Sequence, residues 1–316
     1  MVRSIIDGSV PNIHSVLVYR RGDLVMEEYF PGTMRWDGIH RAFTRDSLHD
    51  IYSVSKSVTS AAVGMALAGG AIPGLDAKIA QYFQDYAGRT STDLSAMTVR
   101  HLLTMSAGLA WDELTTDYLD PANDNRKMDL SPDPLTYLLT RPLAAAPGTR
   151  FVYNSGITHL LGELVRRRTG QPLDTYAASQ IFQPLGIPRY FWYRYPSGLT
   201  HAGGGLHLRP RDMMKFGVLY ANFGRWRGTR LLDSLWVVQS TTKQAPGSSY
   251  GFQWWIDAWT INGQPVSGYS AQGLAGQFIF VIPSQQLVVV FTGNNPGQAE
   301  FIPFQLMRNY IIPALN

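Results

Sequence analysis

The chain has 316 residues, 45% of them hydrophobic and 16% charged, a balance typical of a folded globular protein long enough to bury its own core. It has no cysteine, which excludes a disulfide framework, a thiol nucleophile and a thiolate metal site. The net charge of +4 comes from scattered residues, and the one basic run, Arg166–Arg168, is better explained as the cationic last turn of a helix than as a nucleic-acid-binding patch.

No segment has the composition of a membrane anchor. The N-terminus lacks the apolar stretch of a signal peptide, and nothing approaches the roughly 18 consecutive apolar residues that a spanning helix needs. We therefore expect a cytoplasmic protein without membrane contact, and a homodimer is one option for its assembly.

The first part of the chain combines strand and helix signals. Residues 14–30 consist of two apolar runs around a turn that contains Gly22, which predicts a β-hairpin. Residues 52–68 are small and apolar, end at Gly69 and contain a single charge, Lys56. This composition predicts a helix buried between other elements.

Helical periodicity dominates the stretch 76–196. Helices are expected at 98–106 and 157–168, each ending near a glycine. Residues 115–133 are rich in Asp, Asn and Pro, and we interpret them as a long loop of the kind that often forms a lid or a binding loop.

Strand composition returns after a helix expected at 211–222. Strands are expected at 251–256, 277–282 and 287–292, and a last helix at 301–312. This order indicates an α+β fold in which both chain ends complete an antiparallel sheet, flanked by helices, beside a mostly helical lobe. We assign residues 1–70 and 197–316 to the lobe with the sheet and residues 71–196 to the helical lobe, with the active site between them.

One short motif has the residue types of a nucleophile and its base. Ser53 and Lys56 are three residues apart, so on a helix both side chains lie on one face within reach of each other. A lysine accepts a serine proton only when its pKa is lowered, and the apolar helix around Lys56 would desolvate it. At the helix start, Ser53 would also lie at the positive end of the dipole, where a developing oxyanion is favoured.

The same spacing occurs a second time, at Ser240 and Lys243, where a turn follows and the lysine is expected to be solvated. By itself, the motif at Ser53 leaves catalysis and a plain buried polar contact equally open.

Several segments together resemble the family of β-lactamases and penicillin-binding proteins. Ser53–Lys56 is similar to the family's S-x-x-K motif, and residues 99–109, VRHLLTMSAGL, resemble its H-L-L-T-M-x-S-G-L segment. Residues 151–156, FVYNSG, resemble the Y-x-N/S element of class C-type β-lactamases, family VIII esterases and 6-aminohexanoate-dimer hydrolases. Residues 271–277, AQGLAGQ, stand where the K-T-G element is expected. The matches follow the family's order along most of the chain.

The resemblance implies a β-lactamase/transpeptidase-like fold and a role for each motif. Ser53 would be the nucleophile, Lys56 its activator and Tyr153 the relay for the leaving-group proton. The backbone N–H groups of Ser53 and Leu274 would form the oxyanion hole. The residues that would orient the substrate are Ser155, which could instead orient the lysine, Gln272 and Gly273.

Two positions depart from the family's pattern. Ser155 replaces the asparagine that ends the Y-x-N element, and Ala271 replaces the cation of K-T-G, which in β-lactam enzymes helps to hold the substrate carboxylate. The loss of this cation argues against penicillins as substrates and favours the esterase and aminohexanoate-oligomer hydrolase branch. An arginine or histidine elsewhere in the chain could compensate for it.

The histidines and glycines indicate neither a metal nor a cofactor. Seven histidines without an H-E-x-x-H pattern make a catalytic metal site improbable, and Gly203–Gly205 lack the G-x-G-x-x-G spacing of a dinucleotide site. His101 lies in an apolar helix and is expected to be structural, whereas His201 and His207 flank the three glycines and are better placed for a cleft.

We therefore expect a serine hydrolase that forms an acyl-enzyme on Ser53 and cleaves short-chain carboxylic esters or small linear amides. Two alternatives stay open: a β-lactamase or DD-peptidase, and a non-catalytic protein that binds ligands on the same scaffold. A Ser-His-Asp esterase is disfavoured because the chain has no G-x-S-x-G elbow.

Overall fold

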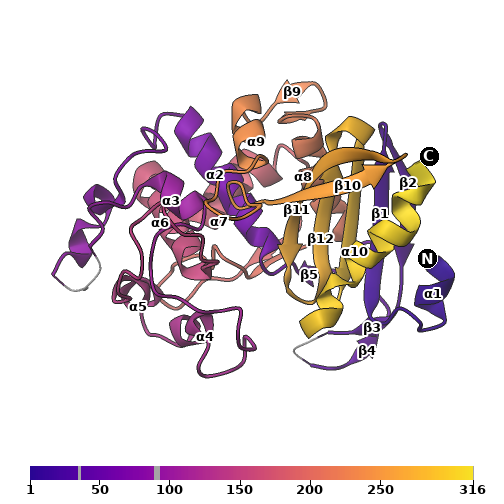
Figure 1. Ribbon diagram of the computed structural model, residues 1–316, viewed down its shortest axis with the longest axis horizontal. Coiled ribbons are helices and arrows are strands. Elements are labelled where there is room, and N and C mark those ends of the chain that lie inside the picture. Colours follow the sequence, from indigo (N-terminus) through magenta and orange to yellow (C-terminus); the bar gives the residue numbers. More distant parts are fainter. Residues whose placement is uncertain (35–36, 89–92, 316) are drawn as a thin grey trace.

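A six-stranded antiparallel sheet, built from both ends of the chain, organises the molecule (Figure 1). The computed structural model describes residues 1–34, 37–88 and 93–315. The strand order is β10-β11-β12-β13-β1-β2, so the opening hairpin joins the C-terminal strands through the pair β1 and β13. The strands are β1 (Ile13–Arg20), β2 (Asp23–Tyr29), β10 (Trp255–Ile261), β11 (Gln264–Gly273), β12 (Gln277–Ile282) and β13 (Leu287–Gly293).

Helices cover both faces of this sheet, which explains why β12 and β13 are continuous apolar runs rather than alternating ones. One face packs against α8 (Pro210–Ala221), and Gly217 allows the close approach, because a Cβ there would lie 2.6 Å from Val288 Cγ1. On the other face, α1 (Val2–Ile6) and α10 (Ile302–Leu306) enclose a second cluster of buried side chains that includes Phe280. Figure 1 shows α10 lying across the sheet, with both termini on this side of the molecule.

The helix α2 (Val54–Ala68) lies between the sheet and the remaining helices and packs against both β11 and α6. Its small residues make this possible: a Cβ on Gly64 would lie 2.5 Å from the ring of Trp236. The predicted burial of this helix is confirmed, while the division of the chain into two lobes stays a prediction. The other helices are α3 (Val99–Leu103), α4 (Asp124–Asp129), α5 (Pro134–Leu139), α6 (Ser155–Thr169), α7 (Leu173–Ala177) and α9 (Ser234–Ser240).

Short strands support the segments near Ser53. In a three-stranded sheet, β7 (Leu206–Leu208) pairs with both β5 (His49–Asp50) and β6 (Phe191–Trp192). The chain just before α2 is thereby tied to the segment that follows Gly203–Gly205. Two further small sheets pair β3 (Gly32–Thr33) with β4 (His40–Arg41) and β8 (Arg225–Trp226) with β9 (Thr229–Arg230).

The structure corrects several predicted boundaries. The segment expected to be a long loop, 115–133, contains α4, and α3 stops at Leu103, shortly before Met105 adopts a left-handed conformation with φ 56°. The strand expected at 251–256 begins only at Trp255, since Gln253 has φ 62°. Residues 302–306 form a regular helix, but the expected last helix continues as a π-type turn over 307–311. Strand β11 was not predicted, because its Pro265 and Gly268 weaken its strand signal.

Candidate active site

Ser53 occupies the N-cap position of α2, at the end of a tight connection from β5. Tyr52 just before it adopts the left-handed conformation with φ 44°, and its N–H donates to Asp50 Oδ1 at 2.9 Å. This conformation is unfavourable for a bulky residue and is held by the surrounding contacts. Ser53 is consequently presented where two cavities meet.

Lys56 is fully enclosed, with 1% of its surface exposed, yet two acceptors lie within hydrogen-bonding distance of its amine. Nζ donates to Ser53 Oγ at 2.8 Å and to the carbonyl oxygen of Gly203 at 2.7 Å. Burial lowers the pKa of Lys56 to about 8, against the opposing charges of Glu113 and Asp129. At neutral pH roughly a tenth of the amine is therefore uncharged and able to accept a proton.

Tyr153 is the third residue of this group. It lines the smaller cavity together with Ser53, and Lys56 Nζ lies 5.0 Å from the centroid of its ring. Burial and then the charge of Glu113 raise the pKa of Tyr153 well above its usual value, so the hydroxyl stays protonated. The ring stacks on Trp255, with the centroids 5.8 Å apart. The structure thus brings together the three residues that the sequence singled out.

Two backbone N–H groups border the site without an internal acceptor. Among the described residues, no hydrogen bond uses the N–H of Ser53 or of Leu274, and both residues line both cavities. The end of β11 approaches the chain before Ser53 closely, because a Cβ on Gly273 would lie 2.3 Å from the carbonyl oxygen of Ile51. Only glycine permits this approach, which keeps the two N–H groups available for an oxyanion.

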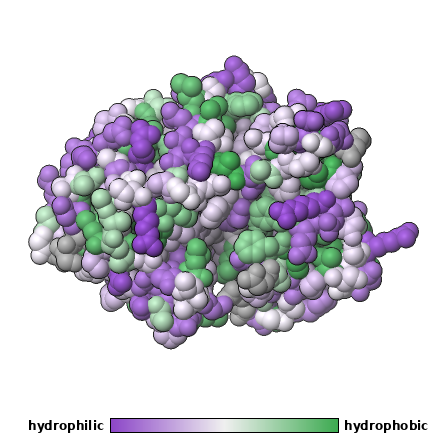
Figure 2. Space-filling view, viewed as in Figure 1, coloured by the Kyte–Doolittle hydropathy of each residue, from purple (hydrophilic) through white to green (hydrophobic). Residues whose placement is uncertain are grey.

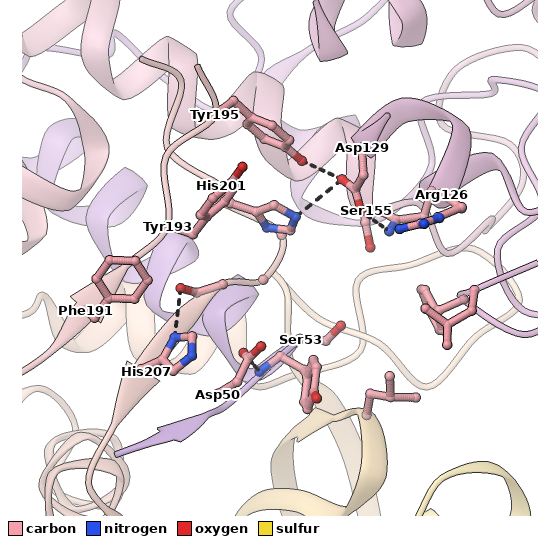
Figure 3. Close-up of a pocket in the computed structure, with 18 residues that line it drawn as sticks. Asp50, Ser53, Arg126, Asp129, Ser155, Phe191, Tyr193, Tyr195, His201 and His207 are labelled. Carbon is pink, nitrogen blue, oxygen red and sulfur yellow. Dashed lines mark hydrogen bonds and ion pairs between the residues drawn. The ribbon is translucent and has the colours of Figure 1, made fainter. Parts of the chain in front are cut away.

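The two cavities differ in size and lining. The larger has a volume of about 530 Å³ and includes Ser155, the three glycines 203–205 and several charged side chains (Figure 3). The smaller has a volume of about 310 Å³ and includes Tyr153, Gln272 and Gly273. Figure 2 shows a surface hollowed near its centre, with hydrophobic side chains along parts of its margin.

A buried carboxylate that was not predicted, Glu113, lies beside these residues and is 1% exposed. It accepts hydrogen bonds from the N–H and the Oγ of Ser155, each at 2.7 Å, from Trp111 Nε1 at 2.7 Å and from the hydroxyl of Tyr118 at 3.0 Å. Ser155 is therefore held by Glu113 and offers only its hydroxyl oxygen to the cavity. A single acidic residue at the start of a polar segment gives no signal of burial.

A second carboxylate that the sequence analysis missed, Asp129, lies in the wall of the larger cavity (Figure 3). It accepts from the Tyr195 hydroxyl at 2.5 Å and from Asn125 Nδ2 at 2.9 Å, and His201 Nε2 lies 3.4 Å away. Burial opposes the charge, but these partners together lower the pKa of Asp129. His207 also lines this cavity, so both histidines next to the glycines lie in the cleft, as expected.

Other predicted residues lie outside the site. Lys243, in the second S-x-x-K sequence, is exposed, and Ala271 is buried in the core, so its side chain contributes to neither cavity. His101 is partly buried and also lines neither cavity. Within the part of the chain that the structure describes, no three potential metal ligands come together, and no helix is both long and apolar enough to cross a membrane.

Comparison with known proteins identifies the family. A sequence model of the Beta-lactamase family matches residues 13–308. The chain belongs to this family. The fold agrees: a Bacillus anthracis structure, described provisionally as a 6-aminohexanoate-dimer hydrolase, superposes with a TM-score of 0.81 over 98% of this chain and 81% of that one, at 22% identity. The predicted β-lactamase/transpeptidase-like fold class is confirmed.

Two curated relatives of this Beta-lactamase-family chain are hydrolases. The 6-aminohexanoate-dimer hydrolase of Paenarthrobacter ureafaciens is 26% identical over 294 residues, which cover 85% of this chain and 70% of the relative. Esterase EstB of Burkholderia gladioli is 30% identical over 182 residues, which cover 55% of this chain and 43% of the relative. The chain thus spans less than half of the esterase's length.

Proposed function

We propose that this protein is a serine hydrolase that cleaves short-chain carboxylic esters or small linear amides through an acyl-enzyme on Ser53. The observation that supports it most is the 2.8 Å separation between Ser53 Oγ and the amine of Lys56, a buried lysine whose pKa is lowered. A core lysine with no chemical purpose would be costly to bury. The hydrolase and esterase names of the two relatives support the same class.

The reaction has two steps. Lys56 takes the proton of Ser53 as Oγ attacks the carbonyl carbon, and the N–H groups of Ser53 and Leu274 hold the oxyanion. The C–O or C–N bond then breaks as Tyr153 gives its proton to the leaving alcohol or amine and takes the proton that Lys56 had accepted. Water attacks the acyl-enzyme by the reverse relay, which releases the acid and restores the Ser53 hydroxyl.

The position of Tyr153 supports one orientation of the substrate. Tyr153 lines the smaller cavity and not the larger one, so a leaving group that receives its proton belongs in the smaller cavity. The acyl group then extends into the larger cavity. Apolar side chains form much of the smaller cavity, which suits an apolar alcohol or amine: Leu114, Trp255, Phe278 and Phe301.

The same orientation disfavours β-lactams and peptidoglycan peptides. In a penicillin the carboxylate belongs to the amine part of the molecule, which would enter the smaller cavity. The only charged side chain among the described residues there is Glu300, and the cation of the K-T-G element is replaced by the buried Ala271. A carboxylate would meet repulsion in this position.

Replacing Ser53 with alanine tests the proposal. Hydrolysis of p-nitrophenyl butyrate should fall about 1,000-fold or more in Ser53→Ala, as is usual when a nucleophile is removed. Nitrocefin and a linear amide are assayed beside it, and labelling by a fluorophosphonate should be lost. Lys56→Ala should cause a comparable loss, whereas Lys243→Ala, in the exposed copy of the motif, should have wild-type activity.

Ester turnover that persists in Ser53→Ala would identify a different nucleophile. A wild-type protein that neither turns over any of these substrates nor reacts with the fluorophosphonate would instead be a binding protein on this scaffold. Nitrocefin turnover that exceeds ester turnover would favour the β-lactamase alternative.

A further inference from the structure

Arg126 is the arginine that lines the larger cavity beside Ser53. It lies on α4, and its backbone N–H donates to Asn123 Oδ1, the cap of this helix, at 3.3 Å. Asn123 is itself fully buried, and its Nδ2 donates to the carbonyl oxygens of Glu113 and Thr116 at 3.1 and 3.2 Å. The base of the Arg126 side chain is therefore anchored to the segment that also holds Ser155 through Glu113.

The guanidinium of Arg126 forms no hydrogen bond or ion pair with any residue that the structure describes. The carboxylates on the same helix are engaged elsewhere. Asp129 interacts with Tyr195, Asn125 and His201, as described above. Asp124 Oδ1 accepts from the Tyr137 hydroxyl at 3.1 Å and lies 3.7 Å from Arg141 Nη2. Figure 3 shows Arg126 beside Asp129 and Ser155, on the opposite side of the cavity from Phe191.

Several other arginines of the described chain are paired with carboxylates. Carboxylate partners at 2.9 Å or less are found for the guanidinium groups of Arg100, Arg166, Arg167, Arg194, Arg209 and Arg211. A guanidinium presents a planar fork of donors that matches a carboxylate and binds it by two parallel hydrogen bonds. In the wall of a half-enclosed cavity, such a group is a ready-made site for a ligand carboxylate.

We propose that Arg126 binds a carboxylate at the far end of the substrate's acyl group, so that the preferred substrates are monoesters or monoamides of dicarboxylic acids. The inference rests on the proposed function, since it takes Ser53 as the nucleophile and the larger cavity as the acyl site. The K-T-G element would place its cation on the leaving-group side of the scissile bond. Arg126 places a cation on the opposite, acyl side. Asp129 forms no ion pair with Arg126 among the described residues, since its hydrogen bonds go to Tyr195 and Asn125 and His201 Nε2 lies 3.4 Å away.

The competing possibility is an acyl group with a terminal ammonium, which Asp129 or Asp50 would attract. Burial raises the pKa of Asp50, against the opposing charges of His207 and His201, which weakens that attraction at the floor of the cavity. The two charge types can be compared directly in esters that share one leaving group.

The experiment measures kcat/KM for three p-nitrophenyl esters: the adipate monoester, the neutral pentanoate, and a pentanoate with a terminal trimethylammonium group. The wild type should prefer the adipate over the pentanoate by about 10-fold or more, the usual effect of a charge-assisted hydrogen bond. Arg126→Gln should abolish this ratio. Lys127→Gln removes the same charge from the same helix at an exposed position and should keep the wild-type ratio. Circular dichroism of both variants checks that they are folded.

Equal kcat/KM for adipate and pentanoate in the wild type would overturn the carboxylate site, as would an adipate preference that survives Arg126→Gln. Preference for the cationic ester would assign the cavity to an ammonium instead. In each case turnover of the pentanoate ester that depends on Ser53 leaves the proposed hydrolase function standing. Turnover of all three esters by Ser53→Ala would remove both proposals together.

Discussion

At the scale of single residues, the protonation of Lys56 links the reaction to pH. Only the uncharged amine accepts the serine proton, and burial lowers the pKa of Lys56 to about 8. Activity should therefore rise with pH and level off above about pH 8. The negative charge of Glu113 raises this pKa, so it helps to set the pH at which the ascending limb of the activity profile lies.

Glu113→Gln removes this charge and keeps the shape of the side chain. We expect the rise of kcat/KM with pH to move to lower pH. Without the Glu113 charge, the lowering of the Lys56 pKa by burial is less strongly offset. The free energy of unfolding should also fall by about 1 to 3 kcal/mol, because all four groups around Glu113 are donors in the structure and an amide nitrogen accepts none of them. Stopped assays across pH, on protein shown to be folded, measure the limb.

A matched control is Glu28→Gln, which removes the same charge at an exposed position and should leave the limb in place. If the limb does not move in Glu113→Gln, Glu113 acts only by holding Ser155 and Tyr118, and the electrostatic role is wrong.

At the scale of single elements, α6 positions the residues on either side of its first turn. Its cap, Asn154, accepts from the N–H of Ile157 at 3.1 Å, and Tyr153 immediately precedes this cap. The other end is also local: Gly170 closes the helix in the left-handed conformation. These signals are contained in the sequence, which is why the helix predicted at 157–168 corresponds well to the observed one.

Asn154→Ala should destabilise the protein by about 1 kcal/mol, the usual cost of losing an N-cap, and should lower kcat as Tyr153 becomes less well held. Urea unfolding followed by circular dichroism measures the first effect and ester assays the second. Asn154→Asp keeps a capping oxygen and should stay close to the wild type in stability. Equal stability of the alanine and wild-type proteins would mean that packing alone defines the start of α6.

At the scale of the whole molecule, the packing of α8 on the sheet sets the distance between layers. Gly217→Ala tests this packing, since the new Cβ would lie 2.6 Å from Val288 Cγ1 and 2.7 Å from Ile279 Cγ2. Alanine improves the helix propensity by about 1 kcal/mol, but overpacking costs about 1 to 3 kcal/mol. We expect a lower Tm by calorimetry, with ester turnover per folded molecule unchanged. Gly74→Ala, where nothing lies within 4 Å, is the control, and a raised Tm in Gly217→Ala would contradict the packing argument.

The sequence by itself determined the features that depend on neighbours along the chain. Ser53 and Lys56 meet because three residues on a helix bring two side chains together, and β12 and β13 follow from continuous apolar runs. Patterns of this kind also allowed the family, the fold class and the three candidate catalytic residues to be predicted.

Only the tertiary structure decided how these residues are tuned and what surrounds them. The lowered pKa of Lys56 results from its burial by distant segments, and its amine donates to the carbonyl of Gly203, 147 residues away. The burial of Glu113, the separation of the two cavities and the position of Arg126, whose guanidinium has no partner among the described residues, arise in the same way. The physical reason is that desolvation and charge pairing depend on every group within a few ångströms in space, whereas sequence patterns report only what lies within a few residues along the chain.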